Sequence, residues 1–290
     1  MSVDRLSAAI AAMKNPTVVG LDPDWNHLPE CLKNGAETLQ AKAEAVLAFN
    51  RRIIDAICDV VPAVKPQSAF YESYGWHGVK VLEETMQYAS SKGMYVICDA
   101  KRGDIGSTAA AYAEAYLSGN AFTADALTVN PYLGSDGILP FVKQCVQNDK
   151  MIFVLVKTSN PSSGELQDLK CEGESLYRKM AALVSEWGKE SLGTCGYNAV
   201  GAVVGATYPT QLAELRQTNP HTFFLVPGYG AQGGGAADVK PAFDIRGGGA
   251  IVNSSRAILT AWKKEGCPAD FDGAARREAL RMREALGEVL

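Results

Sequence analysis

Histidine and closely spaced cysteine pairs are both scarce in this sequence. Only three of the 290 residues are histidine, and these are far apart, as are the seven cysteines. No two cysteines form a CxxC pair and no HExxH motif occurs, so no metal-ligand cluster is expected. An odd, scattered set of cysteines also argues against a disulfide framework and favours a reducing compartment.

Long apolar runs and long basic runs are missing as well. No stretch approaches the ~20 consecutive apolar residues that span a bilayer. Residues 1–16 form an amphipathic pattern that lacks the basic start and apolar core of a signal peptide. The net charge is −4 at pH 7. Neither nucleic acid nor membrane is therefore expected as a partner, and a cytoplasmic location is expected.

The sequence does contain a regular alternation of short apolar runs and longer helical patterns. Eight runs have the composition of strands that are buried on both faces of a parallel sheet: 17–21, 62–65, 94–99, 126–130, 151–157, 199–204, 222–226 and 250–253. Helical spacing occurs at 36–60, 75–91, 107–118, 138–147, 174–192, 211–217, 254–265 and 274–289. This order predicts an α/β fold, a (β/α)8 TIM barrel that spans residues 1–290 as a single domain. An open doubly wound sheet is the alternative.

Charged side chains stand at the carboxyl ends of the first three predicted strands. Asp22 follows the first strand, Lys65 ends the second, and the third runs into the sequence DAKRGD at 99–104. Strand alternation predicts that Asp99 and Lys101 point to the same side. A solvated ionic cluster explains any one of these charges equally well. Because barrel active sites lie at the carboxyl ends of the strands, the alternating set instead favours a catalytic array.

Two segments that follow predicted strands have the composition of working loops. Residues 158–171 (TSNPSSGELQDLKC) follow the fifth strand, and residues 227–249 follow the seventh and contain GYGAQGGG and RGGG. Glycines allow close approach of the backbone to a ligand, and successive N–H groups can bind an anion. Arg256, after the eighth strand, offers a guanidinium suited to phosphate. The sequence therefore predicts a phosphate site, although a flexible linker also explains the glycine run by itself.

These segments together resemble one known family. The segment DAKRGDIGSTA at 99–109 resembles the hallmark segment of the orotidine 5'-phosphate decarboxylases, and GLDPD, VKP, NPYLG, PGYGAQGG and SSRAI follow the order of that family's other blocks. The resemblance covers nearly the whole chain and is closest to the longer bacterial subgroup, type 2. It implies a lyase of de novo pyrimidine biosynthesis that converts orotidine 5'-monophosphate to uridine 5'-monophosphate (UMP) and CO2. It also implies that the reaction needs no metal and no organic cofactor.

The resemblance further implies catalytic roles for four residues. Lys101 is implied to donate a proton to the pyrimidine carbon that loses CO2. Lys65, Asp99 and Lys101 are implied to form an alternating charge network. Asp104 is implied to complete this network from the other subunit of a homodimer with shared active sites.

Substrate-binding residues are implied in the same way. They are Asp22 for the ribose, Ser159 for the pyrimidine, Gly230, Gln232 and Arg256 for the phosphate, and Ile105 and Thr108 across the dimer interface. Two departures from the family pattern affect the loop assignments. Ser255 stands where the family often has glycine before the phosphate arginine, and a second glycine run occurs at 247–249.

Two other functions remain open from the sequence. A metal-dependent sugar-phosphate decarboxylase or aldolase of the same barrel superfamily also carries a D-x-K-x-x-D segment. Such a protein is expected to have a magnesium-binding acid where Lys65 stands. A non-catalytic nucleotide-binding barrel would retain the glycine loop and Arg256 but would not need the lysine–aspartate array.

Overall fold

The structure, a computed structural model, describes residues 1–230 and 233–290. Parallel strands close into a barrel in the order β1-β10-β9-β8-β5-β4-β3-β2. These strands are β1 (Thr17–Leu21), β2 (Ala63–Pro66), β3 (Tyr95–Arg102), β4 (Ala126–Val129), β5 (Met151–Lys157), β8 (Val200–Val204), β9 (Phe224–Val226) and β10 (Ala250–Ser254). The predicted (β/α)8 barrel is confirmed, and the open doubly wound sheet is wrong because β1 pairs with both β2 and β10.

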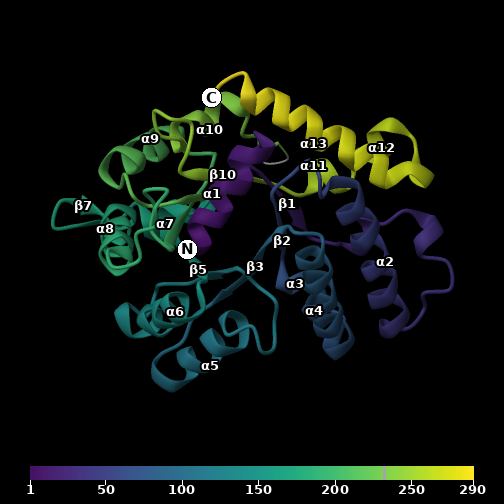
Figure 1. The fold of residues 1–290 in the computed structure, drawn as a ribbon, viewed down its shortest axis with the longest axis horizontal. Coiled ribbons are helices and arrows are strands. Elements are labelled where there is room, and N and C mark those ends of the chain that lie inside the picture. Colours follow the sequence, from purple (N-terminus) through teal and green to yellow (C-terminus); the bar gives the residue numbers. More distant parts are fainter. Residues whose placement is uncertain (231–232) are drawn as a thin grey trace.

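Helices surround this barrel as a ring, and helix α1 (Ser2–Met13) crosses the middle of the view in Figure 1. The ring contains α2 (Leu39–Ile57), α3 (Ser68–Glu72), α4 (Gly75–Ser91), α5 (Gly106–Leu117), α6 (Ser135–Asn148), α8 (Leu176–Gly188), α9 (Pro209–Thr218), α10 (Ala236–Val239), α11 (Arg256–Leu259), α12 (Ala261–Glu265) and α13 (Phe271–Gly287). The single helix predicted at 254–265 is thus two short helices. None of the helices in the described ranges combines the length and the apolar run that a membrane crossing requires.

The predicted loop at 158–171 is more structured than its composition suggests. It contains the short helix α7 (Gly164–Gln167) and then enters a small antiparallel hairpin of β6 (Lys170–Cys171) and β7 (Glu174–Ser175). The segment is therefore a folded cover after strand β5 rather than an irregular loop.

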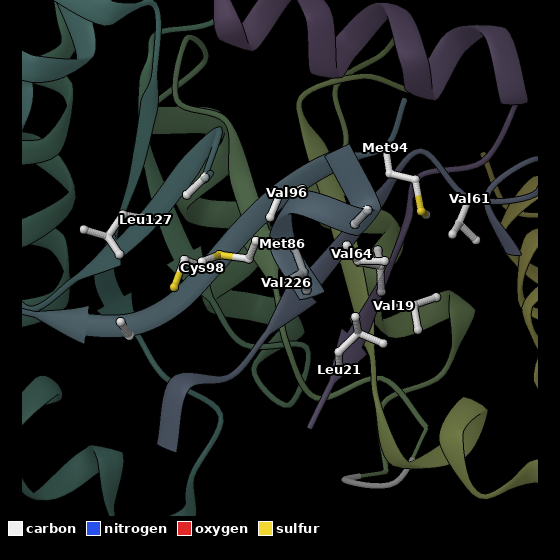
Figure 2. Packing of buried hydrophobic residues seen from close by; sticks show 14 of the residues in the cluster. Val19, Leu21, Val61, Val64, Met86, Met94, Val96, Cys98, Leu127 and Val226 are labelled. Atoms are coloured by element: carbon white, nitrogen blue, oxygen red, sulfur yellow. The ribbon is translucent and has the colours of Figure 1, made fainter. Parts of the chain in front are cut away.

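Two apolar layers follow from the alternation of side chains along the strands. Outward-facing residues such as Val64, Val96 and Leu127 pack against the ring of helices, and Figure 2 shows these side chains together with Met86 of α4. Inward-facing residues fill the amino-terminal half of the barrel, where α1 adds Val3 and Leu6: Val18, Ala63, Tyr95, Ile97, Ala126, Met151, Phe153, Phe223 and Ile251. This half is a closed core, so a ligand site has to lie at the opposite end.

The second glycine run lies at the closed end, away from the carboxyl ends of the strands. Residues 247–249 directly precede strand β10, and Gly249 has a left-handed φ of 84°. The Arg216 guanidinium is buried and donates to the Gly249 carbonyl at 2.7 Å and to the Thr222 carbonyl at 2.9 Å. Burial lowers the pKa of Arg216 to about 10. The expectation that all of 227–249 forms a loop at the active site is therefore wrong for residues 247–249. These residues lie at the closed end of the barrel, where Gly249 binds Arg216.

Candidate active site

A cavity of about 600 Å³ opens at the carboxyl ends of the barrel strands. Its floor is formed by residues near the carboxyl ends of seven strands: Lys65, Asp99, Thr128, Leu155, Val203, Leu225 and Asn253. Phe70, Leu166 and Tyr229 add apolar wall, whereas the remaining wall is mostly polar. The size lies within the range of small-molecule sites, roughly 300–1,000 Å³. The cavity therefore combines a charged half with an apolar half.

Asp99 is the centre of the charged half. Its Oδ2 accepts a hydrogen bond from Lys65 Nζ at 2.8 Å, and its Oδ1 accepts from Lys101 Nζ at 2.7 Å. Thr128 Oγ1 also donates to Asp99 Oδ1 at 2.8 Å. Lys65 Nζ lies 4.0 Å from Asp22 Oδ1. Carboxylates and ammonium groups thus alternate from Asp22 to Lys101, as the strand ends predicted.

Lys101 reaches this array by a route that simple alternation did not predict. Strand β3 continues past Asp99 to Arg102, and its pairing with β4 shifts register between Cys98 and Arg102. Within this irregularity Lys101 has a left-handed φ of 47°, which is unusual for a residue with a Cβ. Its backbone N–H donates to Thr128 Oγ1 at 3.0 Å. The same threonine therefore holds the Lys101 backbone and the carboxylate that binds its ammonium.

The buried members of the array stay ionised because they face one another. Burial acts to raise the pKa of Asp99, but the charges and hydrogen bonds of Lys65 and Lys101 outweigh it and hold the pKa well below its usual range. Burial likewise acts to lower the pKa of Lys65, yet Asp99 and Asp22 raise it above its usual value. Neither group gains or loses a proton near neutral pH as a result.

Asp99→Asn is expected to lower the free energy of unfolding by about 3–5 kcal/mol near neutral pH, because it leaves the Lys65 ammonium buried with only Asp22 nearby. In the wild type the raised pKa of Lys65 contributes stability below the unfolded value of about 10.4, which is lost as the pH rises through the folded pKa. In the variant, burial lowers this pKa instead, so stability increases as the pH rises toward about 10.4.

Urea denaturation at about pH 7 and about pH 9.5 measures this reversal. The stability difference between the two proteins is expected to shrink at the higher pH. A difference that stays constant or grows would contradict the assignment of the Lys65 pKa shift to Asp99.

Two buried oxygens in the cavity are available to a ligand. Asp22 Oδ1 and Asn253 Oδ1 have no hydrogen-bond partner within residues 1–230 and 233–290. Buried polar atoms are usually hydrogen-bonded to protein or water, so such acceptors in a cavity are open to a donor from a ligand or from solvent. Asp22 follows β1 as expected, whereas Asn253, the penultimate residue of β10, was not singled out from the sequence.

Arg256 lies at the rim of the cavity, where helix α11 begins. Its guanidinium forms no ion pair or hydrogen bond with the part of the chain that the structure describes. Ser255 precedes it and packs so closely on Gly20 of β1 that a Cβ at Gly20 would collide with Ser255 Oγ. The backbone before Arg256 is thereby fixed against the barrel. Arg256 therefore lines the cavity even though Ser255 stands where the family often has glycine.

The segment after strand β5 forms one wall, and the glycine loop after β9 lies next to it. Ser159 lines the cavity, and its backbone approaches Gly205 so closely that a Cβ at Gly205 would lie 2.8 Å from Ser159 Cα. Gly228 also lines the cavity, and Gly230 has a left-handed φ of 75° with its N–H bound to the Gly234 carbonyl at 2.8 Å. The predicted phosphate ligand Gln232 lies outside the described residues.

Among the predicted site residues that the structure describes, Asp104, Ile105, Thr108 and Gly230 do not line this cavity. Asp104 Oδ1 accepts a hydrogen bond from the Ile105 N–H at 2.8 Å, and Ile105 is 54% exposed. Thr108 is exposed on helix α5. A single chain therefore gathers the lysine–aspartate array but leaves the side chains of Asp104, Ile105 and Thr108 outside its own cavity.

Several cavity residues were not singled out from the sequence. Thr128 and Asn253 lie in strands whose apolar character gave no reason to expect a functional role, although a polar residue at an inward position was a usable signal. His27 and Tyr229 come from loops. Burial lowers the pKa of His27, and the nearby positive charges of Lys263 and Arg256 add to this effect.

The donor groups of the described residues do not suit a metal ion. No group of three or more histidine, cysteine, aspartate or glutamate side chains is arranged to hold a metal ion in the described ranges. Both oxygens of Asp99 already accept hydrogen bonds from ammonium groups. The charged half of the cavity is therefore built to hold cationic side chains around a carboxylate.

Comparison with known proteins gives a consistent assignment. The sequence profile of the Orotidine 5'-phosphate decarboxylase / HUMPS family matches residues 17–266. The chain is 48% identical over 284 residues to the orotidine 5'-phosphate decarboxylase of Rhodopirellula baltica, covering 96% of this chain and 94% of the relative. It is 40% identical over 301 residues to that of Caldicellulosiruptor bescii, covering 99% and 98%.

A solved structure supports the same relationship. The OMP decarboxylase structure of Leishmania donovani superposes with a TM-score of 0.73 at 33% sequence identity, and the match covers 98% of this chain and 99% of the other. Sequence and fold therefore agree over nearly the full length of these relatives.

Proposed function

This chain belongs to the Orotidine 5'-phosphate decarboxylase / HUMPS family, and we propose that it is the enzyme that converts orotidine 5'-monophosphate to UMP and CO2. The observation that carries the proposal is the array in which one buried carboxylate, Asp99, holds the ammonium groups of Lys65 and Lys101 on the cavity floor. A site that only binds nucleotides has no need of such an array.

The proposed reaction sets the requirement that this array meets. When the bond between the pyrimidine ring and its carboxylate breaks, CO2 leaves and the electron pair stays on the ring carbon. Fixed charges that surround the site can stabilise this carbanion without reorganising. We assign the proton to the Lys101 ammonium, which gives it to the ring carbon and forms the new C–H bond. The neutral amine then regains a proton from solvent.

Asp99 and Lys65 support Lys101 in this scheme. Asp99 keeps the Lys101 ammonium in place through the 2.7 Å hydrogen bond, and Lys65 holds Asp99 from the other side. In the proposed complex Asp99 faces the carboxylate of the substrate, and this repulsion is relieved as CO2 leaves. The buried position of Asp99, 7% exposed, strengthens these interactions because little water screens them.

The other substrate groups are assigned to the remaining walls. Asp22, with its unpaired buried oxygen, accepts hydrogen bonds from the ribose hydroxyls, and Ser159 binds the pyrimidine. Arg256 at the rim binds the phosphate, together with the glycine loop at Gly230 and with Gln232. The phosphate contacts supply binding energy at a distance from the reacting carbon.

We further propose that the chain is a single domain that acts as a homodimer with shared sites. Asp104, Ile105 and Thr108 do not line the cavity of their own barrel, and Tyr132, 77% exposed, adds an apolar side chain to the surface. Residues exposed beside an active site and directly after a catalytic strand are suited to complete the site of a second subunit. Asp104 is assigned to the partner's charge array on this basis.

The proposal is tested by the loss of orotidine 5'-monophosphate absorbance on adding purified protein, with and without EDTA. We expect turnover that EDTA does not change, because the assigned steps use only side chains of this chain. Turnover that EDTA abolishes would favour a metal-dependent reaction. A folded protein that binds UMP without turnover would favour the non-catalytic nucleotide-binding barrel.

A further inference from the structure

A second buried lysine lies at the end of strand β5, and the proposed reaction does not use it. Lys157 is fully buried, with 0% of its surface exposed, and it does not line the cavity as described. A fully buried lysine is rare in proteins unless a partner compensates its charge. Lys157 lies directly before the segment that forms one cavity wall, so its partners show how that segment is held in place.

The hydrogen-bond partners of the Lys157 ammonium belong to that wall segment. Its ammonium donates to Asp168 Oδ1 at 2.7 Å and to Ser163 Oγ at 3.4 Å. It also lies 4.3 Å from the centre of the Tyr208 ring. Tyr208 hydroxyl forms a hydrogen bond with Ser163 Oγ at 2.9 Å. The ammonium therefore sits beneath the segment 158–168 and holds its far end.

This segment carries a large share of the cavity wall. Its lining residues are Thr158, Ser159, Asn160, Ser162, Ser163, Leu166 and Gln167. The segment is closed on itself, since the Thr158 N–H donates to Gln167 Oε1 at 2.9 Å and Gln167 Nε2 donates to Thr158 Oγ1 at 2.8 Å. A small displacement at Asp168 therefore moves the lining residues together.

We propose that Lys157 and Asp168 are positioning residues that lock the segment 158–168 over the base-binding end of the cavity. The inference rests on the proposed function, which places the pyrimidine at Ser159. Release of the segment would remove the Asp168 carboxylate and leave the ammonium buried beside aromatic rings without its charge partner. The locked arrangement is therefore strongly favoured, although the Asp168 side chain itself is 46% exposed.

Lys157→Met and Asp168→Ala test this inference. Methionine fills the buried site without a charge, whereas Asp168→Ala leaves the Lys157 ammonium buried without its charge partner. The double variant Lys157→Met/Asp168→Ala leaves neither charge behind, so it keeps the test valid if a single variant does not fold. The control is Glu172→Gln in the turn of the adjacent hairpin, which breaks the exposed 2.7 Å ion pair between Glu172 and Lys179 of helix α8. The measurements are kcat and KM for orotidine 5'-monophosphate, and the dissociation constants of UMP and of ribose 5-phosphate.

We expect both variants to lower kcat/KM and UMP affinity by roughly 10–100-fold, because a shift of about 1 Å in a positioning contact has effects of that size. Binding of ribose 5-phosphate, which lacks the base, is expected to stay within about twofold of wild type, and Glu172→Gln is expected to behave as wild type. The double variant is expected to be no worse than the poorer single variant, since one interaction is removed.

Three outcomes would overturn the inference. Folded variants with unchanged kcat/KM would show that the lock does not position the segment. Equal weakening of UMP and ribose 5-phosphate would point to a general structural defect. A wild-type protein that neither binds UMP nor turns over orotidine 5'-monophosphate would contradict the proposed function and the inference with it, which separates that failure from the first two.

Discussion

Lys101→Ala is expected to lower kcat by at least about 10⁴-fold while the protein still folds and still binds phosphate ligands. The variant removes two contributions at once: the proton donor and one of the two ammonium groups around Asp99. Proton transfer by a placed acid typically contributes about 10²–10⁴-fold, and loss of a single fixed electrostatic contact about 10²–10³-fold. These contributions combine because the same ammonium supplies both.

The free energy of unfolding of Lys101→Ala is expected to change far less than its kcat. The Lys101 side chain is 45% exposed, so its removal leaves the buried Lys65–Asp99 pair intact. Phosphate binding is assigned to Arg256 at the rim, and it is expected to persist. The variant therefore separates chemistry from binding.

The measurement is single-turnover decarboxylation together with the dissociation constant of UMP. Lys143→Ala is a matched control, because this lysine is exposed on helix α6, away from the cavity. Near-normal turnover by Lys101→Ala would rule out the proposed proton donor. A variant that loses UMP binding along with turnover would instead assign Lys101 to substrate binding.

Mixing inactive Asp104→Ala chains with inactive Lys101→Ala chains is expected to restore activity. In a dimer with shared sites, each heterodimer has one site that combines an intact Lys101 with an intact Asp104 from the other chain, and one site that lacks both. Random exchange at equal concentrations makes about half of the dimers heterodimers, so about a quarter of the wild-type activity is expected. Each variant by itself is expected to remain at its own low level.

Subunit exchange has to be demonstrated independently, for example with chains that carry different tags. Restored activity that rises with the extent of exchange would support the role of Asp104 in the partner's site. Complete exchange without any gain would mean that Asp104 acts within its own chain or does not act in catalysis. The exposed position of Ile105 next to Asp104 makes the first result the expected one.

Much of the fold was available from local sequence pattern. The predicted strand at 17–21 coincides with β1, and that at 151–157 coincides with β5. Strands buried on both faces are continuous apolar runs, and a chain that alternates them with amphipathic helices has few ways to bury both. The charged residues Asp22, Lys65 and Asp99 were found for a related reason, since an ionised side chain at the end of an apolar strand is conspicuous.

Other features depended on contacts between segments far apart in the sequence. The glycine run at 247–249 was expected at the active-site end of the barrel. It lies at the closed end instead, where Arg216 donates a hydrogen bond to the Gly249 carbonyl. Helix α7 and the hairpin after it were not expected in the segment after β5. Lys157 ends an apolar strand as Lys65 does, but its role was not predicted, because only the folded segment above it supplies Asp168.

The sequence by itself determined the barrel, the end at which its site lies and the charged residues of strands β1 to β3. Tertiary structure decided how they meet: the left-handed backbone of Lys101, held by Thr128 of the neighbouring strand, brings its ammonium to Asp99. It also left Asp104 outside the cavity of its own chain. The physical reason is that burial and periodicity are encoded locally, whereas the direction of a side chain at a strand end depends on hydrogen bonds from other strands.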